Sequence, residues 1–373
     1  MAEYLTNTTD LTKVASAIRE KGGTSDLLVY PDGFVTAIQA IQAGTELKII
    51  VTVTSGATVT ATKGSKVVSG TSVNGTCTLV VPEEGEWTVN ATLGGKTSDS
   101  NIVNVVSSYD TVLAFATLND NSWETIRRVS DAGRGANYWS IGDRKAVTLN
   151  GTVGHLTLSN YTTYAFIIGF NHNSSLEGTN RIHFQLAKTA LSGGTDVCFC
   201  DSSYNSTVLT TGYFSMNSSR TNSGGWASSQ MRTKICGTSL SSYSGTIIAV
   251  IPAALRAVLK SVTKYTNNTG NSSDASAVTA TTDYFFLLSE FEVFGSISNA
   301  NSNEASKQTQ YAYYSAGNSK IKYKHNDTST AARWWLRSPQ ASYSYNFMFV
   351  SDDGPVSVGR ADFSFGFAPG FCV

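Results

Sequence analysis

Cysteines and histidines are the residues best suited to chemistry here, because thiolates and imidazoles bind metals and act as nucleophiles or bases. Cys198-Phe199-Cys200 places two thiols on the same side of a strand, and Cys236 is a third thiol that could join them at a metal. The Cys-x-x-Cys spacing typical of zinc sites is absent, and no metal-ligand spacing relates the four histidines, His155, His172, His183 and His325. We therefore predict no metal and no cofactor, and we expect structural or surface roles for the histidines.

Carboxylates are the other candidates, since two of them can divide general acid and base work. Glu290 and Glu292 lie two positions apart, and Asp352 and Asp353 are adjacent. The chain has no Gly-x-Ser-x-Gly motif for a nucleophilic serine. Gly94-Gly95-Lys96-Thr97 matches the end of a phosphate-loop motif, but the first glycine of that motif is missing and predicted strands surround it, so we predict a turn. We predict no catalytic residue and no enzyme activity.

A binding surface is the alternative to catalysis, and the last forty residues, Trp334 to Val373, have a suitable composition. Tyr and Phe are interspersed there with Ser, Gly, Asn and Asp in no regular hydrophobic period. Antibody paratopes combine the same residue types, because rigid aromatics provide contact area at low entropic cost while small polar side chains adapt their hydrogen bonds. We expect the tyrosines after Pro339 to be exposed, since they alternate with polar residues too irregularly for one buried face.

The segment begins with WWLRSP, contains an Ala-x-x-Ser-x-Gly run and ends with FAPGFCV. In these motifs it resembles the C-terminal variable region of proteins diversified by retroelements, which have a C-type-lectin-like fold. In that family, mutagenesis at template adenines varies chosen codons, usually AAC or AAT, and leaves the codons between them unchanged. The resemblance implies a variable region at about residues 340–366, with ligand-binding positions Ser342, Tyr343, Tyr345, Asn346, Phe349, Ser351, Asp352, Pro355, Ser357, Val358, Gly359, Arg360, Asp362, Phe363 and Phe365.

The residue types at these positions agree with the codon rule. Randomising the first two bases of AAC cannot produce Met, Trp, Lys, Glu or Gln, and none of the fifteen positions holds one of these residues. Gln340 and Met348 cannot arise from AAC, so we assign both to the fixed set. We expect the fixed hydrophobic residues around the variable positions to be buried, namely Trp334, Trp335, Phe347, Met348, Val350 and Val356.

The whole chain has 373 residues, of which 41% are hydrophobic and only 14% are charged. This length allows two or three domains, and abundant Thr, Ser, Asn and Gly favour strands, turns and ordered loops. Positive and negative side chains balance to a net charge of zero, so no nucleic-acid surface is indicated. The sequence shows neither a secretory signal nor a membrane-spanning run, and its five cysteines, an odd number, favour reduced and mostly buried thiols.

Residues 1–44 are the part with clear helical periodicity. The first helix is predicted to begin at an Asp10 cap and to stop at Gly22-Gly23, with an apolar face of Leu11, Val14 and Ile18. The second follows Tyr30-Pro31-Asp32-Gly33 and ends at Gly44, with an apolar stripe of Phe34, Ile38 and Ile41. Two helices of this size cannot bury both stripes alone, so we predict packing on further copies or on a partner. The alternative is a helical hairpin lying on the next domain of its own chain.

The pattern of this segment, L-T-x-V-A-x-A-I-R-x-K-x-G followed by Y-P-D-G-F, also carries a resemblance. It is similar to an N-terminal segment common in tail proteins of phages that infect Gram-positive bacteria. The resemblance implies attachment to other tail proteins through residues 1–44. The resemblance to tail-tip variable proteins implies a homo-oligomer, with a trimer favoured.

Residues 45–107 switch to period-two alternation, and short β-rich runs separated by Gly, Ser and Asn turns predict a β-sandwich. The predicted strands are residues 47–53, 57–62, 77–81, 87–92 and 102–106. The stretch Pro82 to Val89 resembles the late hairpin of bacterial immunoglobulin-like repeats, with Trp87 as its core anchor. The resemblance implies an all-β immunoglobulin-like domain that serves as a spacer.

Residues 108–373 are predicted to form one large irregular domain. Its predicted elements include a strand at 164–170, a helix at 252–264 and a buried strand within 283–295. Core-like sequence resumes after three stretches rich in Asn, Ser and Gly, so we predict surface insertions at 217–225, 266–276 and 296–306. Trp123 to Val129, Tyr138 to Asp143, Gly224 to Arg232 and Leu287 to Phe294 are among the phrases that precede WWLRSP. In this order they resemble an α+β bacterial and phage domain related to the C-type-lectin and formylglycine-generating-enzyme folds.

The resemblances together imply a multidomain protein with a short helical N-terminal segment, an all-β immunoglobulin-like sandwich and an α+β C-type-lectin-like domain. They imply a phage tail receptor-binding protein, made in the bacterial cytoplasm and carried on the virion, whose hypervariable surface binds a host cell-surface protein or glycan. Two alternatives stay open: an enzyme of formylglycine-generating-enzyme-like fold, and a structural tail decoration protein with no ligand. The chain lacks the Glu-Pro-Asn, Gln-Pro-Asp and Trp-Asn-Asp calcium motifs of sugar-binding lectins, and it shows no counterpart of the enzyme's cysteine pair.

Overall fold

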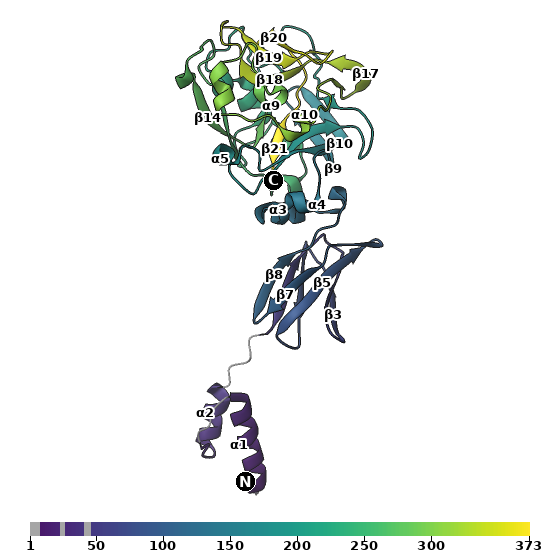
Figure 1. The fold of residues 1–373 in the computed structure, drawn as a ribbon, viewed down its shortest axis with the longest axis vertical. Coiled ribbons are helices and arrows are strands. Elements are labelled where there is room, and N and C mark those ends of the chain that lie inside the picture. Colours follow the sequence, from purple (N-terminus) through teal and green to yellow (C-terminus); the bar gives the residue numbers. More distant parts are fainter. Residues whose placement is uncertain (1–7, 23–26, 41–45) are drawn as a thin grey trace.

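The computed structural model describes residues 8–22, 27–40 and 46–373, which form three parts along the long axis of the molecule (Figure 1). A helical hairpin lies at the N-terminal end, two β-sheets lie in the middle, and a larger domain with several small sheets completes the chain. About 21% of the protein is helical and 37% is strand, and these elements form a mixed multidomain architecture. None of the helices in the described ranges is long and apolar enough to cross a membrane.

Helices α1 (Thr8–Gly22) and α2 (Asp32–Ala40) pack against each other through a small apolar cluster. The buried members of the cluster are Ala15, Ile18 and Phe34. The stripes are not fully buried, as expected for two helices of this size, because Val14 and Ile38 stay 48% and 53% exposed. The hairpin thus leaves apolar side chains uncovered.

The predicted end of helix α1 agrees with the structure, and its predicted start does not. Helix α1 ends at Gly22 as expected, but it begins before Asp10, which lies within its first turns instead of preceding it. Gly23, Ile41 and Gly44 lie outside the described residues.

Eight strands follow and form two sheets around one core. They are β1 (Lys48–Thr52), β2 (Thr58–Lys63), β3 (Lys66–Thr71), β4 (Thr76–Val80), β5 (Gly85–Leu93), β6 (Lys96–Thr97), β7 (Asn101–Val105) and β8 (Ser108–Val112). One sheet has the order β4-β1-β8, and the other has the order β3-β2-β5-β6 with β7 also paired to β5. All five predicted strands are confirmed, and Trp87 is fully buried as expected.

The boundary predicted at residue 107 lies too early. Strand β8 lies directly after it, yet pairs in parallel with β1 of the two-sheet part. Beyond β8, Leu113 and Phe115 enter the core between the two sheets, whereas Val112 and Ala114 belong to the core of the larger domain. Successive side chains of an extended chain point to opposite sides, so this one segment contributes to both cores.

The phosphate-loop-like stretch is a turn, as predicted. Gly94 and Gly95 connect β5 to β6 with positive φ angles of 56° and 78°, a conformation that favours glycine. The Lys96 Nζ donates to both carboxylate oxygens of Asp120 at 2.7 Å, so the residue that would contact a phosphate is paired with the next domain.

The larger domain contains the remaining elements. Its first half comprises η1 (Leu118–Asp120), α3 (Trp123–Asp131), α4 (Gly135–Tyr138), β9 (Arg144–Val153), β10 (Leu156–Phe170), α5 (Ser174–Glu177), β11 (Ile182–Lys188), β12 (Val197–Cys198), α6 (Gly225–Ser228), the π-helical turn η2 (Met231–Cys236), α7 (Ile247–Val250) and α8 (Ala253–Arg256). Its second half comprises β13 (Val262–Asn267), η3 (Ala275–Ala277), β14 (Val278–Asp283), β15 (Phe285–Phe286), α9 (Glu290–Phe294), η4 (Ser302–Ser306), α10 (Ala312–Ser315), β16 (Lys322–Lys324), β17 (Asp327–Ala332), β18 (Trp334–Pro339), β19 (Asn346–Val350), β20 (Val356–Arg360) and β21 (Gly370–Cys372).

The largest sheet of this domain has the order β15-β21-β11-β10-β9. Strand β21 pairs with both β11 and β15, so residues 370–372 lie inside the sheet. The smaller sheets are β12-β16-β17, β13-β14 and β18-β19-β20. In Figure 1, β18, β19 and β20 lie at the end of the molecule farthest from the N-terminal helices.

One predicted element of this domain is wrong, and another is shorter than its range. The helix expected at 252–264 stops after one turn, and Lys264 lies in strand β13, where Val262, Lys264 and Thr266 are buried in alternation. The buried strand expected within 283–295 is limited to β15 and is followed by helix α9. That helix begins after Ser289, whose side chain accepts a hydrogen bond from the N–H of Glu292 and caps it.

Candidate ligand-binding surface

Strand β18 forms the floor under the predicted variable region, and every residue in it is buried. Trp334 and Trp335 are both 0% exposed. The Trp334 Nε1 donates to the carbonyl of Lys320 at 2.9 Å, and the Trp335 Nε1 donates to that of Phe214 at 3.0 Å. Their predicted burial is confirmed, as is that of Phe347, Met348 and Val350, whereas Val356 is half-buried.

The loop between β18 and β19 is held from below by Asn222. Its Nδ2 donates to the carbonyls of Gln340, Tyr343 and Asn346 at 3.1, 2.7 and 3.0 Å. Asn222 is 0% exposed, so the expectation that residues 217–225 are only a surface insertion is wrong. The loop backbone is fixed while side chains such as that of Tyr343, which is 50% exposed, face outward.

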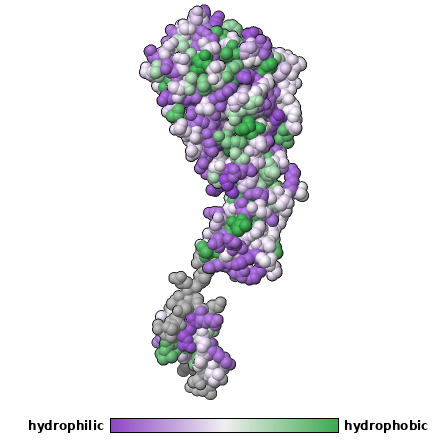
Figure 2. Space-filling model, viewed as in Figure 1, coloured by the Kyte–Doolittle hydropathy of each residue, from purple (hydrophilic) through white to green (hydrophobic). Residues whose placement is uncertain are grey.

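Aromatic and arginine side chains gather on the outer side of this framework. The rings of Tyr343 and Tyr345 meet edge to face with centroids 5.9 Å apart, and the guanidinium of Arg220 lies 4.2 Å from the Tyr345 centroid. The Arg360 guanidinium lies 5.3 Å from the ring of Phe363. Figure 2 shows hydrophobic and hydrophilic residues interspersed over this end of the molecule. Arg and Tyr are residue types enriched at binding hot spots.

Three of the fifteen predicted ligand-binding residues are buried, which contradicts their expected exposure. Phe349 and Phe365 are 5% and 3% exposed, and their rings lie 6.0 and 4.7 Å from Trp335. Asp362 is 0% exposed and accepts two hydrogen bonds from Arg360, at 3.1 and 2.7 Å. This hydrogen-bonded carboxylate raises the pKa of Arg360.

The other twelve predicted positions are exposed or half-buried, as a ligand-binding role requires. They are Ser342, Tyr343, Tyr345, Asn346, Ser351, Asp352, Pro355, Ser357, Val358, Gly359, Arg360 and Phe363. Strands β19 and β20 and the loop before β19 bring them together.

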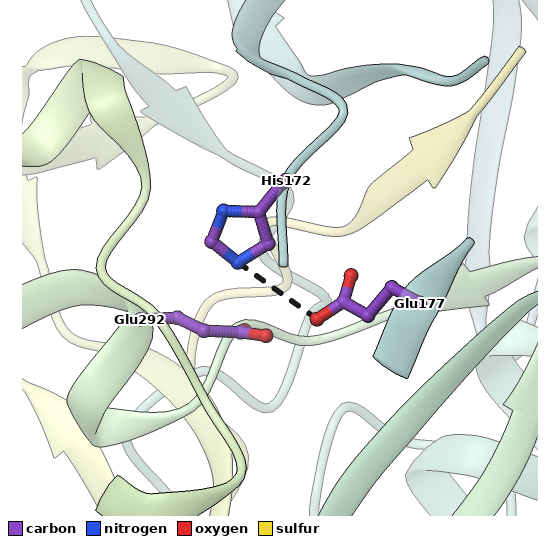
Figure 3. Close-up of side chains that lie close together, drawn as sticks. All are labelled: His172, Glu177 and Glu292. Carbon is purple, nitrogen blue, oxygen red and sulfur yellow. Dashed lines mark ion pairs between the residues drawn. The ribbon is translucent and has the colours of Figure 1, made fainter. Parts of the chain in front are cut away.

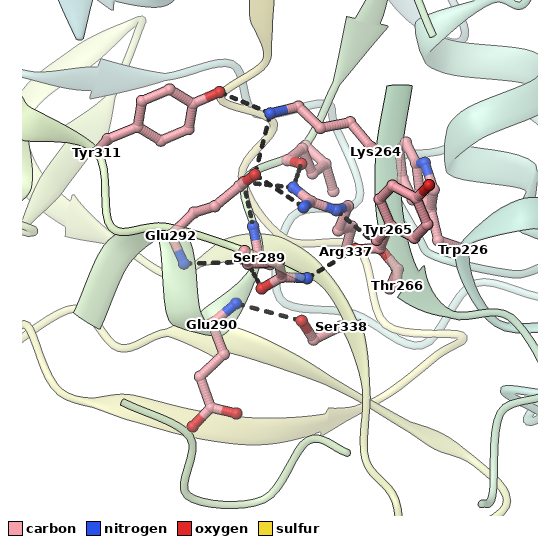
Figure 4. Close-up of polar contacts among 12 residues, drawn as sticks. Trp226, Lys264, Tyr265, Thr266, Ser289, Glu290, Glu292, Tyr311, Arg337 and Ser338 are labelled. Atoms are coloured by element: carbon pink, nitrogen blue, oxygen red, sulfur yellow. Dashed lines mark hydrogen bonds and ion pairs between the residues drawn. The ribbon is translucent and has the colours of Figure 1, made fainter. Parts of the chain in front are cut away.

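A buried polar network attaches the floor to the domain core (Figure 4). Arg337, on β18 and 0% exposed, donates from Nε to Thr266 Oγ1 at 2.7 Å and from Nη1 to the carbonyl of Leu287 at 2.8 Å. Both of its terminal nitrogens also donate to the carboxylate of Glu292, one of them at 2.8 Å. Strands β13 and β18 and helix α9 are joined through this one guanidinium.

Lys264 is the second cation of the network. Its Nζ donates to Glu177 at 2.7 Å, to Glu292 at 3.0 Å and to the hydroxyl of Tyr311 at 2.8 Å. Burial alone would raise the pKa of Glu292, but the charges of Arg337 and Lys264 outweigh it and lower that pKa. The two cations and two carboxylates balance, which allows them to be buried together.

His172, Glu177 and Glu292 lie close enough together to suggest a metal site (Figure 3). The Lys264 ammonium, however, already bonds to both carboxylates and occupies the place of a cation between them. Burial lowers the pKa of His172 to about 3, so the ring is neutral, and it stacks on Tyr311 with centroids 3.7 Å apart. The donor set fits an internal salt-bridge network better than a metal ion.

The other residues considered for chemistry form no candidate metal group within the described ranges. Among the described residues the five cysteines are free and buried, as expected, and the Sγ atoms of Cys198 and Cys200 lie 3.9 Å apart. Cys236 belongs to no candidate metal group within that part of the chain. Glu290 accepts from the backbone N–H groups of Ser298 and Ala300, so it faces away from Glu292.

Sequence patterns did not predict the burial of two further asparagines. Asn267 donates from Nδ2 to the carbonyls of Gly270 and Ser272, and Asn301 donates to those of Ser272 and Asp274. Both are 0% exposed, although the stretches 266–276 and 296–306 were predicted to be surface insertions. Composition does not distinguish the buried asparagines from exposed ones, because Asn271, in the same stretch as Asn267, is exposed.

Glu304, from the last of these stretches, is expected to make stability depend on pH. It accepts hydrogen bonds from Asn267 N and Ser338 Oγ at 2.9 and 2.7 Å, and burial raises its pKa to about 7. An unfolded glutamate has a pKa of about 4.3, so the folded state holds the proton more tightly and this stability is lost as the pH rises through about 7. Relative to Glu304→Gln, the parent should lose roughly 2–3 kcal/mol of unfolding free energy between pH 5 and pH 8.

Urea unfolding of both proteins across this pH range measures the difference. The control is Glu84→Gln, which alters an exposed glutamate of the two-sheet part and should show no such trend. A difference between parent and Glu304→Gln that stays constant with pH would contradict the expectation.

Comparison with protein families gives a match in the larger domain. Residues 204–373 match the family model described as "Domain of unknown function (DUF6273)", and no curated protein matches the chain. The matched range covers less than half of the chain and begins within the larger domain. It contains β18, β19 and β20, Asn222, and both Arg337 and Glu292 of the network. The candidate surface and most of its support are therefore similar to this domain of unknown function.

Proposed function

We propose that this chain is a phage tail receptor-binding protein whose C-terminal surface binds a host cell-surface ligand and is diversified by a retroelement. One observation carries the proposal. Adaptable side chains, including Tyr343, Tyr345 and Phe363, stand on a backbone that buried residues such as Asn222 and Trp335 hold in place. Such a surface tolerates changes of residue type without loss of fold, which diversification requires.

The rest of the chain supports this assignment. We take the larger domain to be C-type-lectin-like and the two-sheet part to be an immunoglobulin-like spacer, which together set the binding surface at the far end from the N-terminal helices (Figure 1). The uncovered apolar side chains of the helical hairpin, Val14, Val35 and Ile38 among them, favour assembly into a homo-oligomer, with a trimer preferred, and attachment to other tail proteins.

An enzyme of formylglycine-generating-enzyme-like fold is the alternative that the geometry favours less. The buried charged residues Lys264, Glu292 and Arg337 bond to one another, so no free acid, base or nucleophile is directed at a substrate there. A tail decoration protein without a ligand would not need exposed aromatics on a loop whose backbone Asn222 holds in place. The flanking DNA offers a further check: a near-copy of the last hundred or so bases, differing at adenines, beside a reverse transcriptase gene.

The test is a variant with Tyr343, Tyr345 and Phe363 all changed to Ser. Phe349, Phe365 and Arg360 are left in place, because the first two are buried and the third pairs with the buried Asp362. Tyr343 is exposed, whereas Tyr345 and Phe363 are half-buried and Phe363 packs on the core cluster. The three changes together should therefore cost no more than about 3 kcal/mol and lower the melting temperature by no more than about 10 °C. Binding of the labelled protein to the strain that the parent binds best, in a panel of Gram-positive bacteria, should fall at least about tenfold.

A matched control changes three exposed residues of the two-sheet part, Val67, Val73 and Ile102, to Ser. It should melt and bind like the parent. The proposal is wrong if the triple surface variant binds the same strain as well as the parent does, or if the control loses binding equally.

A further inference from the structure

We propose that the free edge of strand β20 binds an extended segment of another protein, which joins the β18-β19-β20 sheet as a fourth strand. This inference rests on the proposed function and names the class of its ligand, a polypeptide in β conformation instead of a glycan. Three properties of β20 carry it: the direction of its backbone groups, their lack of partners, and the position of the strand within the predicted variable region.

Hydrogen bonds at both ends of the β19–β20 pairing determine which groups of β20 face outward. Ala361 N donates to Tyr345 O at 2.8 Å, and Ser351 N donates to Pro355 O at 2.7 Å. Bonded and non-bonded pairs alternate along an antiparallel ladder, so the odd-numbered residues of β20 bond to β19. The residues that direct both N–H and C=O away from the sheet are Val356 and Val358.

These outward groups have no partner among the described residues. Strand β20 is the last strand of its sheet, and no hydrogen bond from the described ranges reaches the N–H or C=O of Val356 or Val358. Backbone polar groups that are buried are nearly always paired, so these four groups face water. In Figure 1, β20 lies at the end of the molecule farthest from the N-terminal helices. A row of free donors and acceptors with strand spacing fits an extended peptide backbone, and a sugar ring does not reproduce it.

The central part of the edge also lacks the usual protection against pairing. Exposed edges are normally blocked by Pro, Lys or a bulge. Here Pro355 precedes the strand, and at its end the carbonyl of Arg360 is occupied by the N–H of Phe363. Between them Val356, Ser357, Val358 and Gly359 leave the edge open.

The edge coincides with predicted variable positions, which explains how one surface could change partners. In strand addition, backbone hydrogen bonds supply affinity whatever the sequence, while alternating side chains supply specificity. Ser357, Val358, Gly359 and Arg360 are half-buried members of the variable set on this strand. Their replacement would alter the partner sequence preferred and leave the pairing mode unchanged.

A foreign segment fits this edge better than a second copy of the chain. Two β20 strands paired about Val358 would bring the variable side chains of both copies into one contact, so each new variant would alter its own assembly. The turn before β20 adds a charge preference, because Asp353 is exposed there, next to Asp352, which lies 3.7 Å from Arg333. We expect the bound segment to carry Lys or Arg at the end that lies near Val356.

The experiment selects random fifteen-residue linear peptides, displayed on mRNA, against the full chain. Selected peptides are then synthesised and measured against two variants. Val358→Pro removes an outward N–H and places a ring in the path of the added strand, yet it leaves the β19–β20 bonds in place because Val358 makes none of them. Val80→Pro is the matched control, which makes the same change at an outward-facing position of the edge strand β4, in the two-sheet part.

Selected peptides should bind Val80→Pro within about threefold of the parent and bind Val358→Pro at least about tenfold more weakly. Hydrogen exchange on the unaltered protein gives a second test, which does not depend on the folding of the proline variant. The amides of Val356 and Val358 should exchange rapidly alone and become protected when the peptide binds. Equal binding to both variants, or no protection of these amides, overturns the inference.

Failure of this inference is distinguishable from failure of the proposed function. If the parent and Val358→Pro bind the bacterial strain equally while the Tyr343, Tyr345 and Phe363 triple variant does not, the receptor surface stands and strand addition is wrong. If no peptide is selected and Val358→Pro lowers the molar mass measured by light scattering, a second copy occupies the edge, which also overturns the inference.

Discussion

Arg337→Met is expected to lower the unfolding free energy of the larger domain by about 3–5 kcal/mol, because it leaves a buried carboxylate without its main partner. Arg337 is fully buried, and its guanidinium bonds to Glu292, to Thr266 Oγ1 and to the carbonyl of Leu287. Methionine fills much of the volume and replaces none of these bonds. Urea unfolding of the full chain, followed by tryptophan fluorescence, measures the loss in the transition of this domain.

Arg333→Met is the matched control. It alters an arginine next to the same strand whose side chain is 39% exposed and lies 3.7 Å from Asp352. Exposed ion pairs contribute about 0–1 kcal/mol, so this variant should unfold almost like the parent. A double variant of Glu292→Gln with Arg337→Met should lose less than the sum of the two single losses, by about 1 kcal/mol or more. Equal losses for Arg337→Met and Arg333→Met would contradict the structural role given to Arg337.

Trp335→Ala should be destabilising to a similar extent, by about 3–5 kcal/mol, since it removes a fully buried aromatic and leaves a cavity. The ring of Trp335 contacts those of Phe349 and Phe365, and its Nε1 bonds to the carbonyl of Phe214. Thermal unfolding followed by circular dichroism measures the loss.

The comparison for this variant is Tyr343→Ala, which removes an exposed aromatic from the loop that follows the same strand. It should change stability by no more than about 0.5 kcal/mol while weakening ligand binding. If the two variants melted alike, the division of this region into a buried floor and an exposed surface would be wrong.

Local patterns predicted most of the two-sheet part. Alternating residues such as Val51, Trp87 and Val89 face one core, and period-two hydrophobicity appears directly in a sequence because successive side chains of a strand point to opposite sides. The boundary after this part was missed, since Val112 to Phe115 supply two cores in turn and no composition change marks the transition.

Local patterns failed where tertiary contacts outweigh propensity. The apolar spacing of Leu255, Val258 and Leu259 predicted a long helix, yet β14 pairs with the following residues and draws Lys264 into a strand. Lys264 could not be recognised as buried, because Glu177 and Glu292, which make its burial possible, lie 87 and 28 positions away. The same holds for Arg337 and Glu292, 45 positions apart.

The sequence by itself determined the residue types of the candidate surface, because composition is a local property. It also predicted the burial of Trp334 and Trp335, because large aromatic side chains are recognised without knowledge of their neighbours in space. Only the tertiary structure decided which aromatics face outward. Tyr343 lies on a loop held by Asn222, 121 positions away, whereas Phe349 and Phe365 turn toward Trp335. Exposure depends on what the rest of the chain places beside a residue, and that is decided by long-range packing and not by the residue's neighbours in sequence.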